Sequence, residues 1–501
     1  MAERPLLLGR RVPIGTALGR VGLALAVAFG GLALGAGYWQ VIRSADLSSS
    51  PDDAAVIAAS RQVLRGVITD RDGKRLAWNA RDSSGEPYRV YADPSLSGVI
   101  GYSSRTYGNA GLEAAWNAQL SGVASTDPLF DLTRKFRADP SDPEALQTTL
   151  VLSLQEAAVK ALGDNRGAIV MLDPRSGDVL AMASTPDFDA SALANPTTAA
   201  ATWSSVNADP NLPLLPRATQ ARYVPGSIFK IVTATAALGS GAITTATSYP
   251  QQPAAEKTGL LVDGFRIHDG HHPETDGTAL KFDEAVEVSC NEYFALTGLR
   301  TGGAALADWA ARFGFGQSLP FDLPTAVSQV TNGGGSFGGG FSDEVELANA
   351  AYGQGETLVT PLQMALVAAA VANGGVLMTP HLVMSATGRN GTTDVAPSVW
   401  RQVMDPNVAS EINAAMQLAV NGSLGRKYTF GAQVPGLTVA GKSGTAQLDP
   451  GNDPHSWFIG FAPADNPQVA IAVVVEHGGL TTRGSPIAGE MLQAWRAWAN
   501  G

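Results

Sequence analysis

An uncharged run of 22 residues near the N-terminus, Val21–Ile42, restricts what this chain can fold into more than any other feature. As a helix rising 1.5 Å per residue it would be roughly 33 Å long, enough to cross the ~30 Å hydrocarbon core of a bilayer. Tyr38 and Trp39 lie near its far end, where aromatic residues favour the headgroup boundary. We therefore expect a single transmembrane helix at 21–42.

The charges on the two sides of this run differ in sign. Residues 1–20 carry four arginines against Glu3, a net charge of 4 − 1 = +3, so the rest of a chain of net charge −11 carries −11 − 3 = −14. Because basic flanks stay cytoplasmic, we expect a cytoplasmic tail at 1–20 and an extracytoplasmic body on the cell membrane. A cleaved signal peptide is the alternative, since residues 33–37 are small, but the run exceeds a usual signal-peptide core.

The composition of the body excludes several classes of protein. A length of 501 residues with 45% hydrophobic residues predicts more than one folded domain. The acidic balance argues against a nucleic-acid partner, because binding phosphate needs a basic surface. One cysteine, Cys290, excludes an intramolecular disulfide and any site built from several thiolates. We expect no cofactor.

The patterning predicts two units after the membrane. Residues 43–145 form a small, turn-rich module with a hairpin turn at 70–73. Residues 146–501 form a larger unit, in which Ser153 and Glu156 have the spacing of a capping box and open a helix that ends at Gly163. Near the C-terminus, apolar runs at 437–447, 456–461 and 469–476, followed by a helix at 485–499, predict an antiparallel sheet with a helix packed on it.

The run YVPGSIFK at 223–230 is the first candidate for chemistry. Pro-Gly before an alanine-rich apolar run predicts a helix from Ser227 to about Gly239, which places Ser227 and Lys230 on one face. A serine hydroxyl needs a base before it can act as a nucleophile, and burial can lower the pKa of a lysine enough for that role. Ser-x-x-Lys is a weak pattern alone, and an ordinary helix start with a surface lysine would also fit.

Two further elements strengthen this interpretation. Ser289-Cys290-Asn291 offers a hydroxyl for proton relay and an amide for substrate, with Cys290 expected to be a small buried side chain. A cation beside a glycine on a rigid strand can hold a carboxylate, and two segments offer one: Lys257-Thr258-Gly259 and Lys442-Ser443-Gly444-Thr445. We favour Lys442, because it lies in an apolar strand and follows the other two elements in order.

The histidines suggest two other chemistries. His268, His271 and His272 fall within six residues and are compatible with zinc, but no further His or Cys motif accompanies them, so we expect no metal. A Ser-His-Asp triad is also not expected, because turns and strand ends explain the remaining histidines: His381, His455 and His477.

The three elements in this order resemble the signature of penicillin-binding proteins and serine β-lactamases. Over nearly its whole length the chain is similar to class B penicillin-binding proteins, which are single-span peptidoglycan transpeptidases. Four more segments carry this resemblance: RGVITDRDG at 65–73, YGNAGLE at 107–113, PRATQ at 216–220 and HSWFIGFAP at 455–463. Two mild departures are Asp72 in place of Asn and Ser443 in place of the commoner Thr.

The resemblance implies an α+β fold, in which a β-rich pedestal or dimerisation-like module at 43–145 precedes a transpeptidase domain at 146–501. That domain would combine an antiparallel sheet flanked by helices with an all-α part. The resemblance also implies site roles. Ser227 would attack the D-Ala–D-Ala bond of a stem peptide with Lys230 as base, and Ser289 would protonate the leaving D-Ala. Lys442, Ser443 and Thr445 would hold the substrate carboxylate, Gly444 would let substrate approach, and Asn291 would hold an amide.

In the same resemblance, the backbone N–H groups of Ser227 and Thr445 would form the oxyanion hole, and β-lactams would inhibit by acylating Ser227. A membrane glycan polymerase of the elongation or division machinery is the implied partner. The anchor and the accessory module argue against a β-lactamase, and 146 − 43 = 103 positions are too few for the glycosyltransferase domain of a class A enzyme. A D,D-carboxypeptidase and a non-catalytic, membrane-bound β-lactam receptor remain open. The motifs do not separate a role in cell shape from one in cell division.

Overall fold

The structure is a computed structural model that describes residues 64–122, 142–269, 272, 277–448, 451–479 and 481–501. The expected cytoplasmic tail at 1–20 and transmembrane helix at 21–42 lie outside these residues. In the part that is described, no helix combines the length and the apolar character that a membrane crossing requires.

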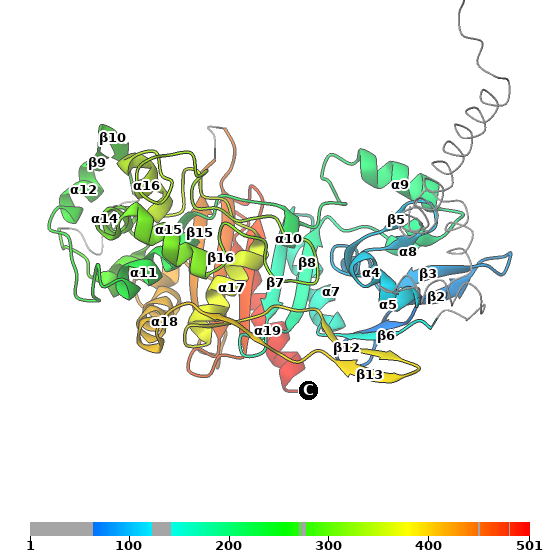
Figure 1. Cartoon of the computed structure of the whole chain (residues 1–501). Helices are drawn as coiled ribbons and strands as arrows, with labels where there is room; N and C mark the ends of the chain where they lie inside the picture. Colours follow the sequence, from blue (N-terminus) through cyan, green and yellow to red (C-terminus); the bar gives the residue numbers. More distant parts are fainter. Residues whose placement is uncertain (1–63, 123–141, 270–271, 273–276, 449–450, 480) are drawn as a thin grey trace, which may run out of the picture. The chain divides into compact units, whose positions relative to one another are not determined.

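A five-stranded antiparallel sheet carries the larger unit (Figure 1). Its strand order is β15-β16-β17-β7-β8, so β15 is an edge strand whose outer side is free of the sheet's own hydrogen bonds. The strands are β7 (Gly167–Leu172), β8 (Val179–Thr185), β15 (Ala440–Ala446), β16 (His455–Ala462) and β17 (Val469–Val475). The predicted C-terminal strands are thus confirmed, with shorter ends for the first.

Helices cover both faces of this sheet (Figure 1). Helix α17 (Pro361–Ala372) packs on one face, while α7 (Leu152–Leu162) and α19 (Gly484–Ala499) pack on the other. Alternate residues of β17 therefore enter two different hydrophobic clusters, as the two-residue period of a strand requires. All residues of β7, β8, β16 and β17 are buried, which explains their nearly unbroken apolar sequences.

A second, mainly helical layer lies beside β15, and it supplies two of the three predicted motifs. Its helices are α11 (Lys230–Gly239), α12 (Gln252–Thr258), α13 (Phe282–Val288), α14 (Asn291–Thr301), α15 (Gly303–Arg312), α16 (Glu344–Ala351) and α18 (Pro406–Asn421). The hairpin β9 (Leu260–Val262) and β10 (Phe265–Ile267) follows α12, and β11 (Val376–Met378) pairs with β14 (Val399–Gln402). The remaining elements after β8 are α8 (Ala190–Ala194), α9 (Ala199–Ala208), α10 (Arg217–Gln220), η3 (Gly226–Phe229) and η5 (Gly425–Lys427).

A six-stranded sheet in the order β13-β12-β6-β1-β2-β3 builds the N-terminal module. Its strands are β1 (Ile68–Thr69), β2 (Arg75–Arg81), β3 (Pro87–Tyr91), β6 (Ala145–Thr148), β12 (Val383–Gly388) and β13 (Gly391–Asp394). The predicted boundary between residues 145 and 146 falls inside β6, and β12 and β13 return to this sheet from much later in the chain. The module is completed by η2 (Pro94–Leu96), β4 (Ser103–Ser104), β5 (Gly108–Asn109), α4 (Gly111–Ala115) and α5 (Asn117–Ser121).

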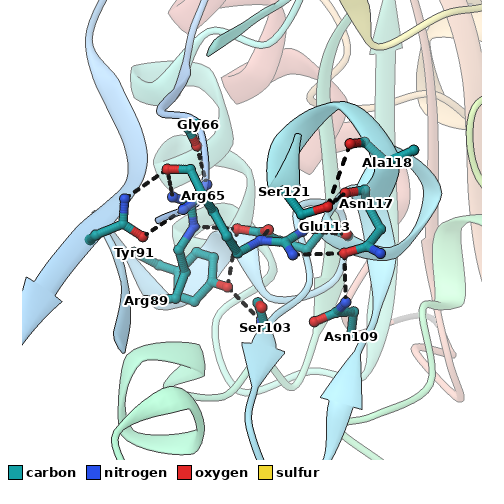
Figure 2. A network of polar contacts seen from close by, with 11 residues as sticks. Arg65, Gly66, Arg89, Tyr91, Ser103, Asn109, Glu113, Asn117, Ala118 and Ser121 are labelled. Carbon is teal, nitrogen blue, oxygen red and sulfur yellow. Dashed lines mark hydrogen bonds and ion pairs between the residues drawn. The ribbon is translucent and has the colours of Figure 1, made fainter. Parts of the chain in front are cut away.

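Two segments that carried the family resemblance meet around the buried carboxylate of Glu113 (Figure 2). Arg65 Nε donates to Glu113 Oε2 at 2.7 Å, and Arg89 Nε donates to Oε1 at 2.6 Å. Arg89 also donates to the carbonyl of Gly66 at 2.7 Å. Both arginines are thereby satisfied inside the module, so RGVITDRDG and YGNAGLE are one structural unit.

The start of α7 differs from the prediction. The helix begins at Leu152 after Val151, and Ser153 makes no capping hydrogen bond. Instead, Asp70 Oδ2 accepts a hydrogen bond from Leu152 N at 3.2 Å, while Oδ1 accepts from the N–H groups of Asp72 and Lys74. The carboxylate that organises the predicted hairpin turn therefore also caps a helix 82 positions away.

Candidate active site

The predicted nucleophile lies in a tight turn that leads directly into a buried helix. Residues 226–229 form the 3-10 turn η3, and α11 continues from Lys230. Ser227 is partly exposed, whereas the Lys230 side chain is fully buried. The predicted helix is confirmed, with a tighter first turn than expected. This turn packs against β15, the free edge of the central sheet.

Lys230 points its ammonium group at the second predicted motif. Its Nζ donates to Ser289 O at 2.5 Å, to Asn291 Oδ1 at 2.7 Å and to Ser289 Oγ at 3.3 Å. Burial lowers the pKa of Lys230 to about 8, although the charge of Asp269 works in the opposite direction. About one-tenth of such a group is neutral at pH 7, far more than for an ordinary lysine, and the neutral form is the one that a general base requires.

The second motif sits where two helices meet. Ser289 ends α13 with φ +66°, a left-handed conformation that only a tightly held non-glycine residue keeps, and Asn291 begins α14. Cys290 is fully buried, its Sγ accepts from Tyr293 N at 3.4 Å, and burial raises the pKa of its thiol. This confirms the expectation of a small buried side chain, and the thiol also caps a helix.

Lys442 reaches the Ser289 hydroxyl from the central sheet. It is 1% exposed on β15 and donates to Ser289 Oγ at 2.8 Å and to Ser443 O at 3.1 Å. Burial and then the charge of Lys230 lower its pKa well below the ordinary value. Gly444 is buried against the Ser227 turn, whereas Ser443 is partly exposed and Thr445 is exposed. The rival Lys257 is an exposed residue of α12.

The structure therefore brings Lys230, Ser289, Asn291 and Lys442 together by direct hydrogen bonds. Within the described part of the chain, none of these bonds includes Ser227 Oγ, which is placed through the turn's packing on β15. Hydrogen bonds of catalytic groups are often long without substrate and close only in the complex.

Sequence reasoning missed a buried polar cluster directly behind this site. Asp269 accepts a hydrogen bond from Asn291 N, and Glu292 is fully buried, with no hydrogen-bond partner for its Oε1 among the residues that the structure describes. Burial and the neighbouring Asp269 raise the pKa of Glu292 to about 8. Their only sequence signal was position: Asp269 lies in the histidine-containing turn, and Glu292 follows Asn291.

The same cluster is where the described residues could hold a cation. One ligand atom each from Glu256, His272 and Cys290 lie within 4.8 Å of one another, and the same holds for Asp269, Cys290 and Glu292. Cys290 lies beside His272 in the fold, although 18 positions separate the two residues in the sequence. His271 lies outside the described residues.

The other histidines have structural contacts. His381 Nε2 pairs with Asp178 at 3.0 Å, and His455 Nδ1 accepts from His477 N at 3.2 Å. Burial lowers the pKa of His455 to about 4, so this ring is neutral at pH 7. Neither contact involves Ser227.

With this site defined, the chain falls into a known class of enzyme. Residues 167–495 match the penicillin-binding protein transpeptidase domain, and residues 65–139 match the penicillin-binding protein A dimerisation domain. The chain belongs to the penicillin-binding protein transpeptidase family, as a class B member. It is a peptidoglycan D,D-transpeptidase, a serine acyltransferase that binds β-lactams.

Its relatives cover the chain almost from end to end. It is 35% identical to peptidoglycan D,D-transpeptidase PbpA of Mycolicibacterium smegmatis over 499 residues, 96% of this chain and 98% of the relative. Among solved structures, the ceftriaxone acyl-enzyme of penicillin-binding protein A from M. tuberculosis is 30% identical, with a TM-score of 0.76 over 87% of this chain and 99% of that one. The D,D-transpeptidase domain of a peptidoglycan glycosyltransferase from Eggerthella lenta is 30% identical, with a TM-score of 0.74 over 87% of this chain and 99% of that one.

Proposed function

We propose that Ser227 is the nucleophile of this transpeptidase and that Lys230 is the base that activates it. Ser227 Oγ attacks the carbonyl carbon of the penultimate D-Ala of a stem peptide, and Lys230 Nζ takes the hydroxyl proton. The C–N bond then breaks, terminal D-Ala leaves as an amine, and an ester to Ser227 remains. The lowered pKa of Lys230 supports this role, because a neutral amine has a lone pair to accept the proton.

Ser289 is the relay between the base and the leaving group. Its Oγ accepts hydrogen bonds from both Lys230 and Lys442, so a proton taken by Lys230 has a short path through this hydroxyl. Protonation of the departing nitrogen through Ser289 lets terminal D-Ala leave neutral. The convergence of three distant motifs on this one oxygen is the observation that carries the proposal.

Substrate lies along β15 in this proposal. Lys442, Ser443 and Thr445 hold its terminal carboxylate, and Asn291 holds an amide of its backbone. Gly444 lets the nucleophile turn pack closely against this strand, because a Cβ atom there would lie 2.9 Å from the carbonyl oxygen of Pro225. The N–H groups of Ser227 and Thr445 form the oxyanion hole, which the packing of the nucleophile turn on β15 supports. An amine of a neighbouring stem peptide then attacks the ester, forming the cross-link and releasing Ser227.

We also propose that the enzyme is a single-pass protein of the cell membrane, with a cytoplasmic tail at 1–20, a span at 21–42, a pedestal module at 43–145 and the catalytic domain at 146–501 outside. The sign change of charge across the uncharged run supports this orientation. A membrane glycan polymerase is the proposed partner, since cross-linking acts on strands that such an enzyme makes.

The proposal is tested by incubating the full chain with lipid-linked peptidoglycan strands and a separate polymerase, then digesting and separating the muropeptides. Cross-linked dimers together with released D-Ala are expected, and both should be absent in Ser227→Ala. D-Ala release without dimers would indicate a D,D-carboxypeptidase, and penicillin binding without either product would indicate a receptor.

A further inference from the structure

The segment that delivers Ser227, residues 217–226, is held by contacts that the reaction itself does not use. Its backbone pairs with a strand-like stretch: Tyr223 N donates to Val359 O, and Val359 N donates to Tyr223 O, each at 2.9 Å. Gly226 N donates to Gly353 O at 2.9 Å. These backbone bonds fix one side of the segment. Side chains from the central sheet contact its other side.

Glu476, just after β17, holds that other side through its carboxylate. Oε1 accepts hydrogen bonds from Arg217 Nε and from the Tyr223 hydroxyl, each at 2.8 Å, and Oε2 forms an ion pair with Arg166 Nε at 3.1 Å. Arg217 is 1% exposed and gives its remaining N–H groups to the carbonyls of Leu212 and Asn211. A single partly buried carboxylate therefore ties both ends of the segment 217–223 to the sheet.

Two side chains of β16 also contact this segment. Trp457 Nε1 donates to Val224 O at 3.1 Å, three residues before the nucleophile. The Tyr223 ring stands edge-on to Trp457 and to His455, with ring centroids 5.9 and 5.3 Å away. These are the histidine and tryptophan of HSWFIGFAP, a motif to which the reaction assigns no chemical step.

The segment has no room to shift toward the substrate strand. A Cβ atom on Gly226 would lie 2.6 Å from Thr445 O, and one on Gly444 would lie 2.9 Å from Pro225 O. Ser227 thus sits at closest approach to the strand that carries Lys442. Displacements of about 1 Å at a reacting group can cost on the order of 100-fold in rate.

We propose that Tyr223, Glu476 and Trp457 are positioning residues that set the place of Ser227 against β15. They act through the backbone of 223–226 and do not touch the reacting atoms. The inference rests on the proposed role of Ser227 as nucleophile. It predicts that loosening this segment slows acylation within the bound complex more than it weakens binding.

The test uses two variants. Tyr223→Phe removes one hydrogen bond and keeps the ring, whereas Trp457→Phe removes one hydrogen bond together with part of a fully buried indole. Stopped-flow acylation by a chromogenic cephalosporin separates the binding constant from the acylation rate constant. We expect each variant to lower the acylation rate constant by about 10-fold and to leave the binding constant within about 2-fold.

Tyr91→Phe is a matched control. Tyr91 and Tyr223 are each 6% exposed, and each donates from its hydroxyl to a glutamate that also pairs with two arginines. A similar loss of melting temperature with an unchanged acylation rate is expected for Tyr91→Phe. An unchanged acylation rate in folded Tyr223→Phe and Trp457→Phe would overturn the inference. Ser227→Ala in the same assay must abolish acylation, and acylation that survives there would instead refute the role of Ser227.

Discussion

Lys230 and Lys442 donate hydrogen bonds to the same atom, Ser289 Oγ, at 3.3 and 2.8 Å. One lysine comes from a helix and the other from a sheet edge, and both are almost completely buried. The shared burial lowers both pKa values, and the charge of Lys230 further lowers that of Lys442. Two buried positive charges close together disfavour the fully protonated pair, so one lysine loses its proton more easily. A lysine must be neutral to act as a catalytic base.

The first prediction concerns the pH dependence of acylation. Because neutral Lys230 is the active form and its pKa is about 8, the rate of penicillin acylation should rise with pH and level off above about 8. Lys230→Met should lower the rate by about 100- to 10,000-fold, the usual range for loss of general-base catalysis. Stopped-flow acylation across pH 6 to ~9.5 measures both. A rate that is flat with pH in the wild type would contradict Lys230 as the base.

The second prediction separates the two lysine–hydroxyl–glycine segments. Lys442→Met removes a charged hydrogen-bond donor from the proposed carboxylate site and should lower acylation efficiency by about 10- to 100-fold. Lys257→Met changes an exposed residue of α12 and should leave it within about 2-fold of wild type. Stopped-flow acylation of both variants makes the comparison. A larger loss of acylation efficiency in Lys257→Met than in Lys442→Met would indicate that Lys257 belongs to the site instead.

The third prediction is a stability effect of Lys230. Its folded pKa of about 8 lies below the ordinary value of 10.5, so between these pH values the unfolded chain keeps a proton that the folded chain has lost. The contribution of Lys230 to the free energy of unfolding therefore rises with pH through this window. Denaturant unfolding of wild type and Lys230→Met at several pH values should show the wild type gaining relative to the variant as pH increases. A difference that stays constant from pH 8 to 10.5 would show that burial does not shift this pKa.

The fourth prediction compares two equally short ion pairs in different surroundings. Glu113→Gln leaves the buried Arg89 and the partly buried Arg65 without a counter-ion and should cost about 3–5 kcal/mol of unfolding free energy. Asp173→Asn breaks the 2.6 Å pair with Arg175, whose side chain is 52% exposed, and should cost less than about 1 kcal/mol. Thermal unfolding of both variants makes the comparison, and equal losses would show that burial is not what makes the Glu113 network matter.

Much of the site could be predicted from sequence, because each motif is local. Pro-Gly before an apolar run fixed the position of the Ser227 turn, and a continuous apolar strand distinguished Lys442 from Lys257. The three C-terminal strands and the helix that follows them could also be predicted from local patterning and turns, whereas the pairing of β17 with β7 could not.

What sequence reasoning missed depends on contacts between distant residues. Val151, not Ser153, precedes α7, because Asp70 reaches across the fold to cap the helix. Cys290 and His272 are 18 positions apart in the sequence and come together only in the folded chain. Glu476 is an ordinary strand end in the sequence, and its hold on Arg217 and Tyr223 appears only when the sheet is formed. No spacing rule connects such pairs.

The most direct test of the central claim is mass spectrometry of the purified full chain after reaction with benzylpenicillin. If Ser227 is the nucleophile, each molecule carries one adduct, which proteolysis and fragmentation locate on Ser227, and Ser227→Ala carries none. An adduct on another residue, or one that persists in Ser227→Ala, would contradict this role of Ser227.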